Sequence, residues 1–585
     1  MENVEVAKIL NDYADLLDIK GENPFRVRSY RKVAQSIEHS SRPLAELIED
    51  DADLTTLPGI GTSMADHLRE IIETGTLSAF QTLQKKVPGT LVVLLRLEGL
   101  GPKKVKTLYH ELGITSITEL RTALNSGEVE TLPGFGKTTA HKLRQSLKEF
   151  DRHRQRFKLV DVEQLIRPFL DYMRKAPGIE KLEVAGSFRR RKETIGDVDV
   201  LIACDKPEPV MKYFQKFSSV KRVENAGTTK GTILLQSGLK VDLRLLHRNA
   251  FGAALHYFTG SKAHNIAIRQ LGVGKGLRIS EYGVFRVSKT KGATKTRKTR
   301  EHRIGGSAEM DVFQAVGLSW IAPELRENQG EIEKAQKNNL PKLIELKDIR
   351  GNLHMHSTWS DGQNTIEEMV RACKDLGYQY CAMTDHSRST RIAGGLDIKD
   401  LKNQWKEINT IRKRLKGIRL LASAEVDILP DGDLDYPDHI LENLDIVVAS
   451  IHSHLTMSKR DMTKRIIKAI CHQAVDIIGH PTQRQINDRD PYALDFEEIF
   501  RAARDHDVAL ELNAQPIRLD LSDVYVRRAK EIDVKIAINS DAHSVENLQF
   551  MRYGIDQARR GWLEKENVVN TLPWNTLKQW LHRRR

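Results

Sequence analysis

The sequence predicts a multidomain protein with an α-helical amino-terminal region, an α+β middle and a carboxyl-terminal domain of alternating strands and helices. Three observations support this. The chain has 585 residues, which is more than one hydrophobic core usually serves. A Gly-apolar-Gly turn recurs three times before residue 150. After residue 349, strand-like and helix-like segments alternate regularly, as in βα-repeat domains.

Composition restricts the compartment and the partners. The chain carries 92 Lys and Arg against 79 Asp and Glu, and the resulting charge of +13 favours a polyanionic partner. The 4 cysteines are scattered without a Cys-x-x-Cys pair, which argues against a cysteine zinc site and favours a reducing compartment. Apolar stretches such as 91–95 fall far short of the roughly 20 residues that span a bilayer. The start of the chain is acidic and amphipathic, unlike a signal peptide. We therefore expect a cytoplasmic protein with no membrane partner.

The repeated turn lies at 57–61, 98–101 and 132–136, and each copy precedes a helix-like stretch with basic residues. Its glycines allow close backbone approach, and the first N–H groups of the next helix lack partners and suit a phosphate. The alternative is a tight turn that serves only helix packing. The repeats resemble helix-hairpin-helix DNA-binding units, which implies contacts to the DNA backbone without sequence preference. The implied DNA-binding residues are Gly59, Gly61, Gly99, Gly101, Gly134 and Gly136.

In helix-hairpin-helix units the turn carbonyls often hold a monovalent cation. The resemblance therefore also implies Na⁺ or K⁺ near the first two turns. The residues placed beside it would be Leu57, Ile60, Leu97 and Leu100.

Two aspartates inside an apolar run indicate a second kind of site. Asp197 and Asp199 are two residues apart, so in a strand they share one face. Two close anions beside buried residues repel each other unless a divalent cation lies between them. Asp242, on a strand-like segment at 240–245, would complete the carboxylates needed for two metal ions. The alternatives are a solvent-facing edge strand and an ion pair of Asp242 with Arg244.

A Gly-Ser turn at 186–187 precedes these aspartates and is followed by basic residues at 189–192. Such a turn can offer N–H groups and a hydroxyl to a triphosphate. Gly-Ser, a spacer and Asp-x-Asp resemble the nucleotidyltransferase superfamily signature. The longer match, GSFRRRKETIGDVDVLI at 186–202 with YFTGSKAHNIAIR at 257–269, resembles the family X DNA polymerases, of which polymerase beta is a member.

The resemblance assigns roles to the matching positions. It implies that Asp197, Asp199 and Asp242 are catalytic and bind two Mg²⁺ or Mn²⁺ ions, with Asp242 acting on the primer 3′-hydroxyl. It implies a template contact for Arg269. The implied nucleotide-binding residues are Ser187 and Arg190 for the triphosphate, Gly196, then Tyr257, Phe258 and Gly260 for the sugar, and Asn265 for the base edge.

Two positions depart from the polymerase beta pattern. Arg191 stands where glycine is usual, which leaves the conformation of this turn open. Ser63 and His67 replace two lysines, one of which forms a Schiff base in polymerase beta. A neutral imidazole cannot form that adduct, so we expect no deoxyribose-phosphate lyase activity of this type.

Histidines and acids follow apolar runs throughout the last third of the chain. His354 and His356 share a strand face, and further groups stand at 385–386, 425–427, 452–454 and 541–543. Functional groups gather at the carboxyl ends of parallel strands, so we expect these side chains to converge. Mixed imidazole and carboxylate ligands suit zinc, manganese or iron, and such sites activate water against phosphate esters. We interpret Asp427, Asp431, Asp433 and Asp435 as turn and surface acids.

The order of these groups resembles the polymerase-and-histidinol-phosphatase (PHP) domain, which has a distorted βα barrel and holds up to three metal ions. The resemblance implies Mn²⁺, Zn²⁺ or Fe²⁺ here, and His354, His356 and His452 as catalytic residues, with His454 as an alternative to His452. The implied ligands are His354, His356, Asp361, His386, Glu425, His452, His480, Asp541 and His543.

These resemblances together suggest domain boundaries. We expect a helical DNA-binding domain at 1–85, two further helix-hairpin-helix units at 86–155, a nucleotidyltransferase palm at 156–255, a nucleotide-selection subdomain at 256–320, a linker at 321–347 and a PHP phosphoesterase domain at 348–575.

Over almost the entire chain, the sequence therefore resembles a family X DNA polymerase of the bacterial or archaeal type with a carboxyl-terminal PHP domain. Its expected substrates are gapped or nicked double-stranded DNA and deoxynucleoside triphosphates, and we expect a monomer. It would fill short gaps in base excision repair by two-metal nucleotidyl transfer, while the PHP domain acts as a 3′–5′ exonuclease or processes 3′ ends, with abasic-site cleavage as a weaker expectation. Two alternatives are an untemplated nucleotidyltransferase with a small-molecule phosphatase tail, and a non-catalytic DNA-end-binding scaffold.

Overall fold

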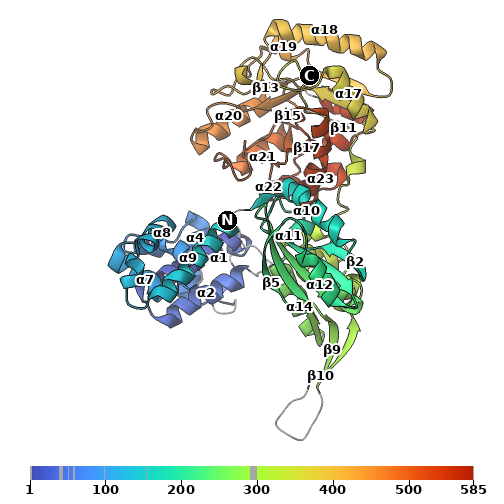
Figure 1. Cartoon of the computed structure of the whole chain (residues 1–585). Helices are drawn as coiled ribbons and strands as arrows, with labels where there is room; N and C mark the ends of the chain where they lie inside the picture. Colours follow the sequence, from blue (N-terminus) through green and yellow to red (C-terminus); the bar gives the residue numbers. More distant parts are fainter. Residues whose placement is uncertain are drawn as a thin grey trace. The chain divides into compact units, whose positions relative to one another are not determined.

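The structure is a computed structural model that describes residues 3–38, 44–49, 52–56, 60–95, 97, 99–154, 156–289 and 299–583. The chain forms two compact units, Met1–Arg156 and Phe157–Arg585 (Figure 1). Within the described residues, no helix is both long enough and apolar enough to cross a membrane.

The first unit is helical and has one apolar core, to which Leu10, Leu68, Leu108 and Leu143 contribute. Local signals fix the helix ends. Ser116 and Glu119 form a capping box at the start of α8. The helices of this unit are α1 (Asn3–Lys20), α2 (Pro24–Glu38), α3 (Leu44–Glu49), α4 (Thr62–Thr74), α5 (Ser78–Gln84), α6 (Leu91–Leu94), α7 (Pro102–Leu112), α8 (Ile117–Ser126) and α9 (Lys137–Arg154).

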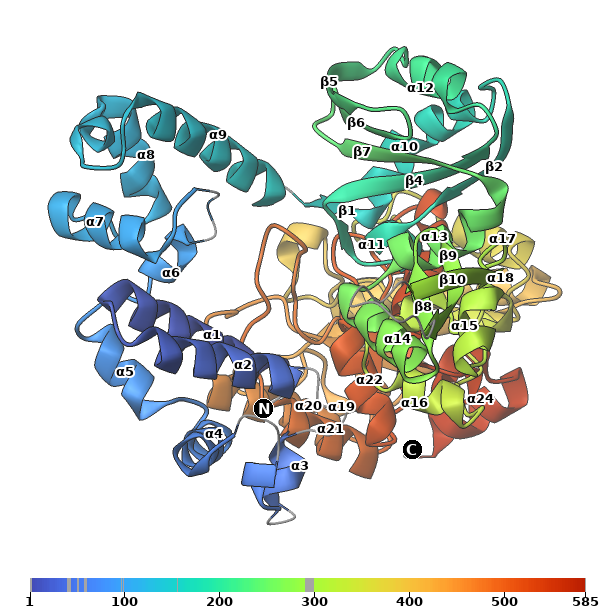
Figure 2. The ribbon, with the colours of Figure 1, turned by 90° about the horizontal axis from the view of Figure 1, so that it is seen from below.

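The second unit begins with a five-stranded sheet, here called the palm, in the order β2-β4-β7-β6-β5 (Figure 2). Its strands are β2 (Ile179–Val184), β4 (Asp197–Cys204), β5 (Val220–Ala226), β6 (Lys230–Leu235) and β7 (Lys240–Leu246). Alternate residues of β4, such as Val200 and Ile202, pack with α10 (Leu159–Met173) and α12 (Pro207–Gln215). The intervening Leu201 and Ala203 pack with α13 (Phe251–Thr259) on the other face. The short strands β1 (Phe157–Lys158) and β3 (Thr194–Ile195) pair beside the sheet.

A smaller subdomain follows the palm. It contains α14 (Lys262–Gly274), β8 (Leu277–Ser280), β9 (Gly283–Lys289), β10 (Thr299–Gly305) and α15 (Met310–Val316), and the three strands form an antiparallel sheet. The segment predicted as a linker contains α16 (Glu331–Gln336). Its residues Ile321, Ile332 and Ala335 belong to the same apolar core as Phe313 of α15, so this segment is packed structure.

The carboxyl-terminal domain is a seven-stranded parallel sheet in which every strand pairs with its neighbours in chain order. A bridge between Met355 and Ala542 joins its two ends into a distorted barrel. The strands are buried on both faces, which explains continuous apolar runs such as 446–449. They are β11 (Gly351–Asn352), β12 (Tyr380–Met383), β13 (Arg419–Asp427), β14 (Ile446–Ser450), β15 (Ile477–Ile478), β16 (Ala509–Asn513) and β17 (Ile536–Asn539).

Helices surround this barrel (Figure 1). They are α17 (Ile366–Asp375), α18 (Ile398–Arg414), α19 (Asp438–Leu441), α20 (Lys459–Cys471), α21 (Phe496–Asp505), α22 (Asp523–Glu531) and α23 (Met551–Arg560). A further helix, α24 (Trp574–His582), packs Leu577 and Trp580 against alternate strand residues such as Val448 and Ala537. The polar residues at the carboxyl ends of the strands are thereby held by a rigid frame.

Candidate active sites

The palm brings the three predicted carboxylates onto neighbouring strands. Parallel pairing of β4 with β7 sets Asp199 directly opposite Asp242, and Asp197 two residues earlier on the same face. Burial, reinforced by repulsion from Asp197 and Asp242, raises the pKa of Asp199 to about 7. A carboxylate cluster with this repulsion fits divalent cations, which would remove it. Asp242 pairs with Lys240, whose Nζ lies 3.8 Å from Asp242 Oδ2, whereas the Arg244 guanidinium lies over the Phe258 ring.

The Gly-Ser turn lies directly beside these carboxylates. Gly186 has a φ of +64°, and a Cβ at this position would lie 2.5 Å from Asp199 Oδ2. Only glycine therefore fits, for both backbone conformation and space. The helical turn α11 (Gly186–Arg189) places Ser187 next to this contact. The turn and the carboxylates together can hold a triphosphate next to metal ions.

The predicted triphosphate and sugar residues meet at the end of α13. Arg190 Nε donates to Glu327 Oε1 at 3.0 Å, and Arg190 Nη1 donates to the Thr259 carbonyl. Gly260, with a φ of +65°, lies close enough that an added Cβ would be 3.3 Å from Arg190 Nη1. Arg191 takes the left-handed conformation usual for glycine, with a φ of 55°. The turn therefore keeps the conformation that glycine favours although the residue differs.

The remaining predicted nucleotide and template residues lie along α13 and α14. Asn265 Nδ2 donates to the Tyr257 carbonyl at 2.6 Å. The Arg269 guanidinium lies 5.9 Å from the centre of the Tyr257 ring, and Phe258 packs edge-on against the same ring. Gly196 separates β3 from β4, directly before Asp197. These residues thus lie in one region with Arg190.

The turns of the first unit precede helices, as the repeat predicts. Gly61 and Gly101 are the N-cap residues of α4 and α7, and Gly136 directly precedes α9. Gly99 and Gly134 have φ values of +90° and +83°, a conformation that favours glycine. The side chains of Ile60, Leu97 and Leu100 are buried in the helical core. Leu57 and Gly59 lie outside the described residues.

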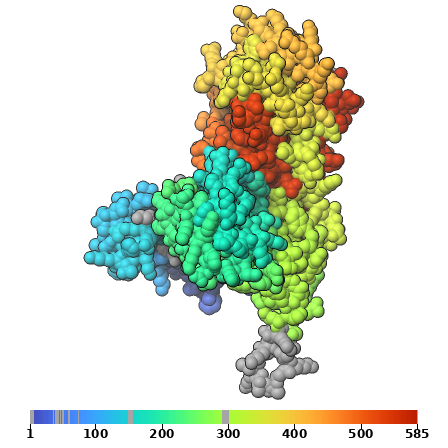
Figure 3. Space-filling model, turned by 45° about the vertical axis from the view of Figure 1, so that its right-hand side comes forward, coloured from blue at the N-terminus to red at the C-terminus, as the bar shows by residue number. Residues whose placement is uncertain are grey.

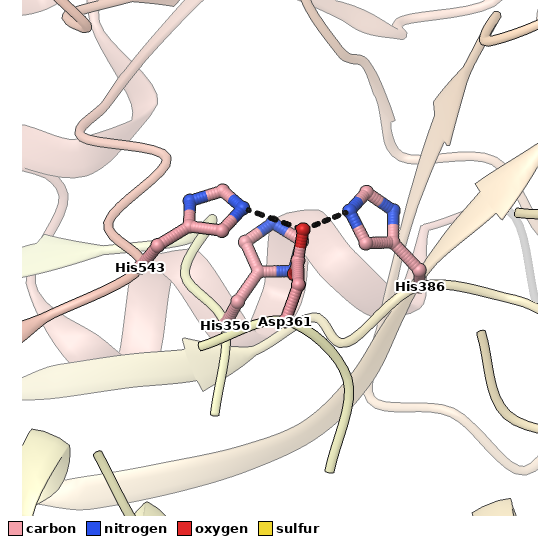
Figure 4. A group of neighbouring side chains, drawn as sticks. All are labelled: His356, Asp361, His386 and His543. Carbon is pink, nitrogen blue, oxygen red and sulfur yellow. Dashed lines mark ion pairs between the residues drawn. The ribbon is translucent and has the colours of Figure 1, made fainter. Parts of the chain in front are cut away.

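In the carboxyl-terminal barrel, predicted ligands meet in three overlapping groups whose ligand atoms lie within 4.8 Å of one another. Among the described residues, all such groups lie in this barrel. In the first group, shown in Figure 4, two histidines approach Asp361 Oδ2: His543 Nε2 at 3.3 Å and His386 Nε2 at 3.6 Å. The groups are His356, Asp361, His386 and His543; His354, His356 and Asp541; and His386, Glu425 and His452.

Glu425 is the central carboxylate of this cluster. His480 Nε2 lies 2.9 Å from Glu425 Oε1, and His386 Nδ1 lies 2.8 Å from Oε2. Burial alone would raise the pKa of Glu425, but the surrounding imidazoles of His452, His386 and His354 hold it well below its ordinary value. Glu425 is therefore an anion that can bind metal.

One histidine of the cluster is neutral without metal, whereas Glu425 and Asp361 raise the pKa of another, His386, to about 10 despite its burial. Burial, with the neighbouring His543 and His386, lowers the pKa of His356 to about 3, so this imidazole is neutral. Several buried ligand atoms lie close to one another but make no hydrogen bond of suitable geometry with the described residues, which fits a site built for ions. They are His354 Nε2, both ring nitrogens of His356, His386 Nδ1 and both carboxylate oxygens of Glu425.

His452, rather than His454, belongs to the cluster. His452 Nε2 lies 3.4 Å from Glu425 Oε1, while His454 is exposed on the following turn. The interpretation of Asp427 as a surface acid was wrong: its side chain is buried and accepts from the backbone N–H of His452 at 3.0 Å. Asp435 is also buried and pairs with Arg388 at 3.1 Å. Asp431 and Asp433 are exposed, as expected.

Sequence reasoning missed one buried acid, Glu511. Its Oε1 lies 2.8 Å from His354 Nδ1, and its Oε2 accepts from the backbone N–H of His480 at 2.7 Å. It therefore fixes the ring of one predicted ligand and the backbone of another. The signal was an acid inside the apolar run of β16, where an unpaired charge would be costly.

Comparison with known proteins agrees with this arrangement. Family models match a helix-hairpin-helix domain at 1–77, a SAM-like helix-hairpin-helix tandem at 92–149, a DNA polymerase beta thumb at 254–327 and a PHP domain at 352–515.

Curated relatives match either the whole chain or its parts. The "DNA polymerase/3'-5' exonuclease PolX" of Bacillus subtilis is 40% identical over 585 residues, covering 100% of both chains. DNA polymerase lambda of Rattus norvegicus is 26% identical and covers 56% of each chain. A probable phosphatase of Thermoanaerobacter is 30% identical over 37% of this chain and 89% of its own. The chain therefore belongs to the family X DNA polymerases that carry a carboxyl-terminal PHP domain.

Proposed function

We propose that this protein fills short gaps in DNA during base excision repair, and that its barrel domain removes 3′-terminal nucleotides. The observation that carries the proposal is that one compact unit contains two clusters of side chains that suit metal ions. One is the carboxylate set on β4 and β7, and the other is the histidine-rich cluster of the barrel.

In the palm, Asp197, Asp199 and Asp242 would hold two Mg²⁺ or Mn²⁺ ions. Bound ions of this kind activate the attacking hydroxyl and neutralise charge on the transferring phosphate. Asp242 would face the primer terminus. Ser187 and Arg190 would bind the triphosphate and orient it for in-line attack.

In the barrel, the ligand set of imidazoles and carboxylates fits Mn²⁺, Zn²⁺ or Fe²⁺. Such ions supply a water of lowered pKa as nucleophile at neutral pH. Glu511 and Asp427 would keep His354 and His452 in the orientation that this site needs. Glu425 would be one of the carboxylate ligands, because histidines approach both of its oxygens.

A labelled primer in a gapped duplex tests both reactions at once. We expect wild type with deoxynucleoside triphosphates to fill the gap, and without them to shorten the primer. Asp242→Asn should only degrade, whereas His354→Ala should only extend. Loss of a metal ligand should lower the affected activity by roughly a hundredfold or more.

The control variants are Asp171→Asn, an exposed acid of α10, and His439→Ala, an exposed histidine of α19. Both should keep both activities. Extension of single strands as efficiently as gapped duplex would favour an untemplated nucleotidyltransferase instead. Unchanged activities in Asp242→Asn and His354→Ala would contradict the assignment of both sites.

A further inference from the structure

The loop that carries the predicted triphosphate ligands is held by the barrel domain. This loop, residues 187–193, is here called the triphosphate loop. Helix α23 and the segment after His480 both belong to the barrel domain, and both contact it. In Figure 3 the red surface of the barrel domain adjoins the blue-green surface of the palm.

The first contact fixes both the backbone and the side chain of Arg190. Arg560, whose side chain is 3% exposed, donates from Nη1 to the Arg190 carbonyl at 2.9 Å and to Glu327 Oε1 at 3.1 Å. The same oxygen of Glu327 accepts from Arg190 Nε at 3.0 Å. Asp523 holds the other end of Arg560, at 2.6 Å from Nη2. One carboxylate thus joins the predicted nucleotide ligand to a residue of the barrel domain.

The second contact is made by the side chain of Arg191, the residue that stands where glycine is usual. Its φ of 55° is strained for a residue with a side chain, and such strain persists only where surrounding contacts enforce it. Arg191 Nη1 lies 2.8 Å from Glu163 of α10, and Nη2 lies 2.6 Å from Asp556 of α23. The Arg191 guanidinium therefore connects the turn both to α10 of the palm and to α23 of the barrel domain.

The third contact holds the far end of the loop. Glu193 Oε2 lies 2.7 Å from Arg484 Nη2. Arg484 follows the predicted metal ligand His480 by four residues. The barrel domain, which carries the histidine-rich cluster, therefore contacts the triphosphate loop at Arg190, Arg191 and Glu193.

We propose that Arg560 is a positioning residue for nucleotide addition: acting with Glu327 and Arg191, it sets the orientation of Arg190 toward the triphosphate. This inference rests on the proposed polymerase function of the palm. Its physical basis is that Glu327 is shared, so removal of Arg560 leaves that carboxylate free to draw Arg190 to a new position. Small displacements of a binding group near the reacting atoms cost rate strongly.

Single-nucleotide gap filling by the full-length protein, at varied deoxynucleoside triphosphate concentration, tests this. For Arg560→Gln we expect the KM for the nucleotide to rise roughly tenfold, with a smaller change in kcat. Shortening of a single-stranded primer should remain at the wild-type rate. Arg191→Gly relieves the backbone strain and removes the ion pair with Asp556, and it should raise the same KM several-fold. If Arg560→Gln does not fold, the KM of Arg191→Gly tests the inference.

Arg559→Gln is the matched control. Arg559 is the neighbour of Arg560 on α23, but its partners are Glu324 at 2.8 Å and the Ile344 carbonyl at 3.0 Å, both outside the triphosphate loop. Its nucleotide KM should equal that of wild type. An unchanged KM in Arg560→Gln and Arg191→Gly, or an equal rise in Arg559→Gln, would overturn the inference. Wild type that adds no nucleotide at all would instead contradict the proposed polymerase function.

Discussion

The palm and the barrel hold their acidic side chains in different ways. In the palm the three carboxylates lie on adjacent strands, Asp197 is exposed, and burial together with repulsion from the other two carboxylates disfavours the charged form of Asp199. In the barrel, Glu425 and Asp541 are buried and surrounded by imidazoles. A site of oxygen ligands, one of them exposed, suits Mg²⁺, which keeps several water ligands. A buried site rich in nitrogen ligands suits ions that stay bound.

The largest expected effect comes from removing one ligand in each site. Asp199→Asn should lower gap filling by roughly a thousandfold, while His356→Ala should lower primer shortening to a similar degree. Each variant should leave the other activity within about twofold, because distant sites without shared partners behave independently. Rates of both reactions on one labelled primer measure this. A large loss of both activities in either variant would break the comparison.

A smaller effect on primer shortening is expected from changing Glu511, which orients metal ligands but is not a ligand itself. Glu511→Gln should weaken metal binding in the barrel by about 10- to 100-fold. Primer shortening should therefore fall at low Mn²⁺ and recover as Mn²⁺ is raised, with gap filling unchanged. Glu566→Gln, at an exposed position of the same domain, is the control. Loss of shortening that no amount of added metal restores would show that Glu511 does more than orient ligands.

The smallest effect concerns pH. The pKa of Asp199 is raised from 3.8 to about 7 by burial and its acidic neighbours. A raised carboxyl pKa means that the folded protein without metal loses stability as pH rises through this window. Metal must displace the proton below pH 7, so its affinity for the palm should fall about tenfold per pH unit there. The gain in melting temperature on adding Mg²⁺ should therefore be smaller at pH 6 than at pH 8. In Asp199→Asn this difference between the two pH values should be much smaller. Equal pH dependence in both proteins would contradict this cause.

Much of both sites was predictable because regular strands impose simple rules. Residues two apart share a strand face, which predicted that Asp197 and Asp199 lie together. The carboxyl ends of parallel strands meet at one edge, which predicted that His354, His386 and Asp541 converge. The same two-residue rule applied to Glu425 would have placed Asp427 beside it, so that error was avoidable.

Other features had no local signal or an incomplete one. The contact of Arg191 with Asp556 joins residues 365 positions apart, and only the packing of two domains brings them together. The segment at 321–347 is polar and contains Pro341, yet the side chains of Ile321 and Ile332 are buried in the subdomain core. The acid inside the apolar run of β16 did signal a buried partner for Glu511, but the local sequence does not reveal that the partners are His354 and the backbone of His480.

Anomalous scattering from crystals soaked in Mn²⁺ tests the central claim most directly, namely that one unit contains two separate metal centres. We predict peaks within coordination distance of Asp199 and Asp242, and a second set among His356, Asp361 and Glu425. Asp199→Asn should lose the first set and keep the second. Absence of manganese beside Asp199 and Asp242 in the presence of a bound nucleotide, or histidine side chains of the barrel without any ion between them, would contradict the account.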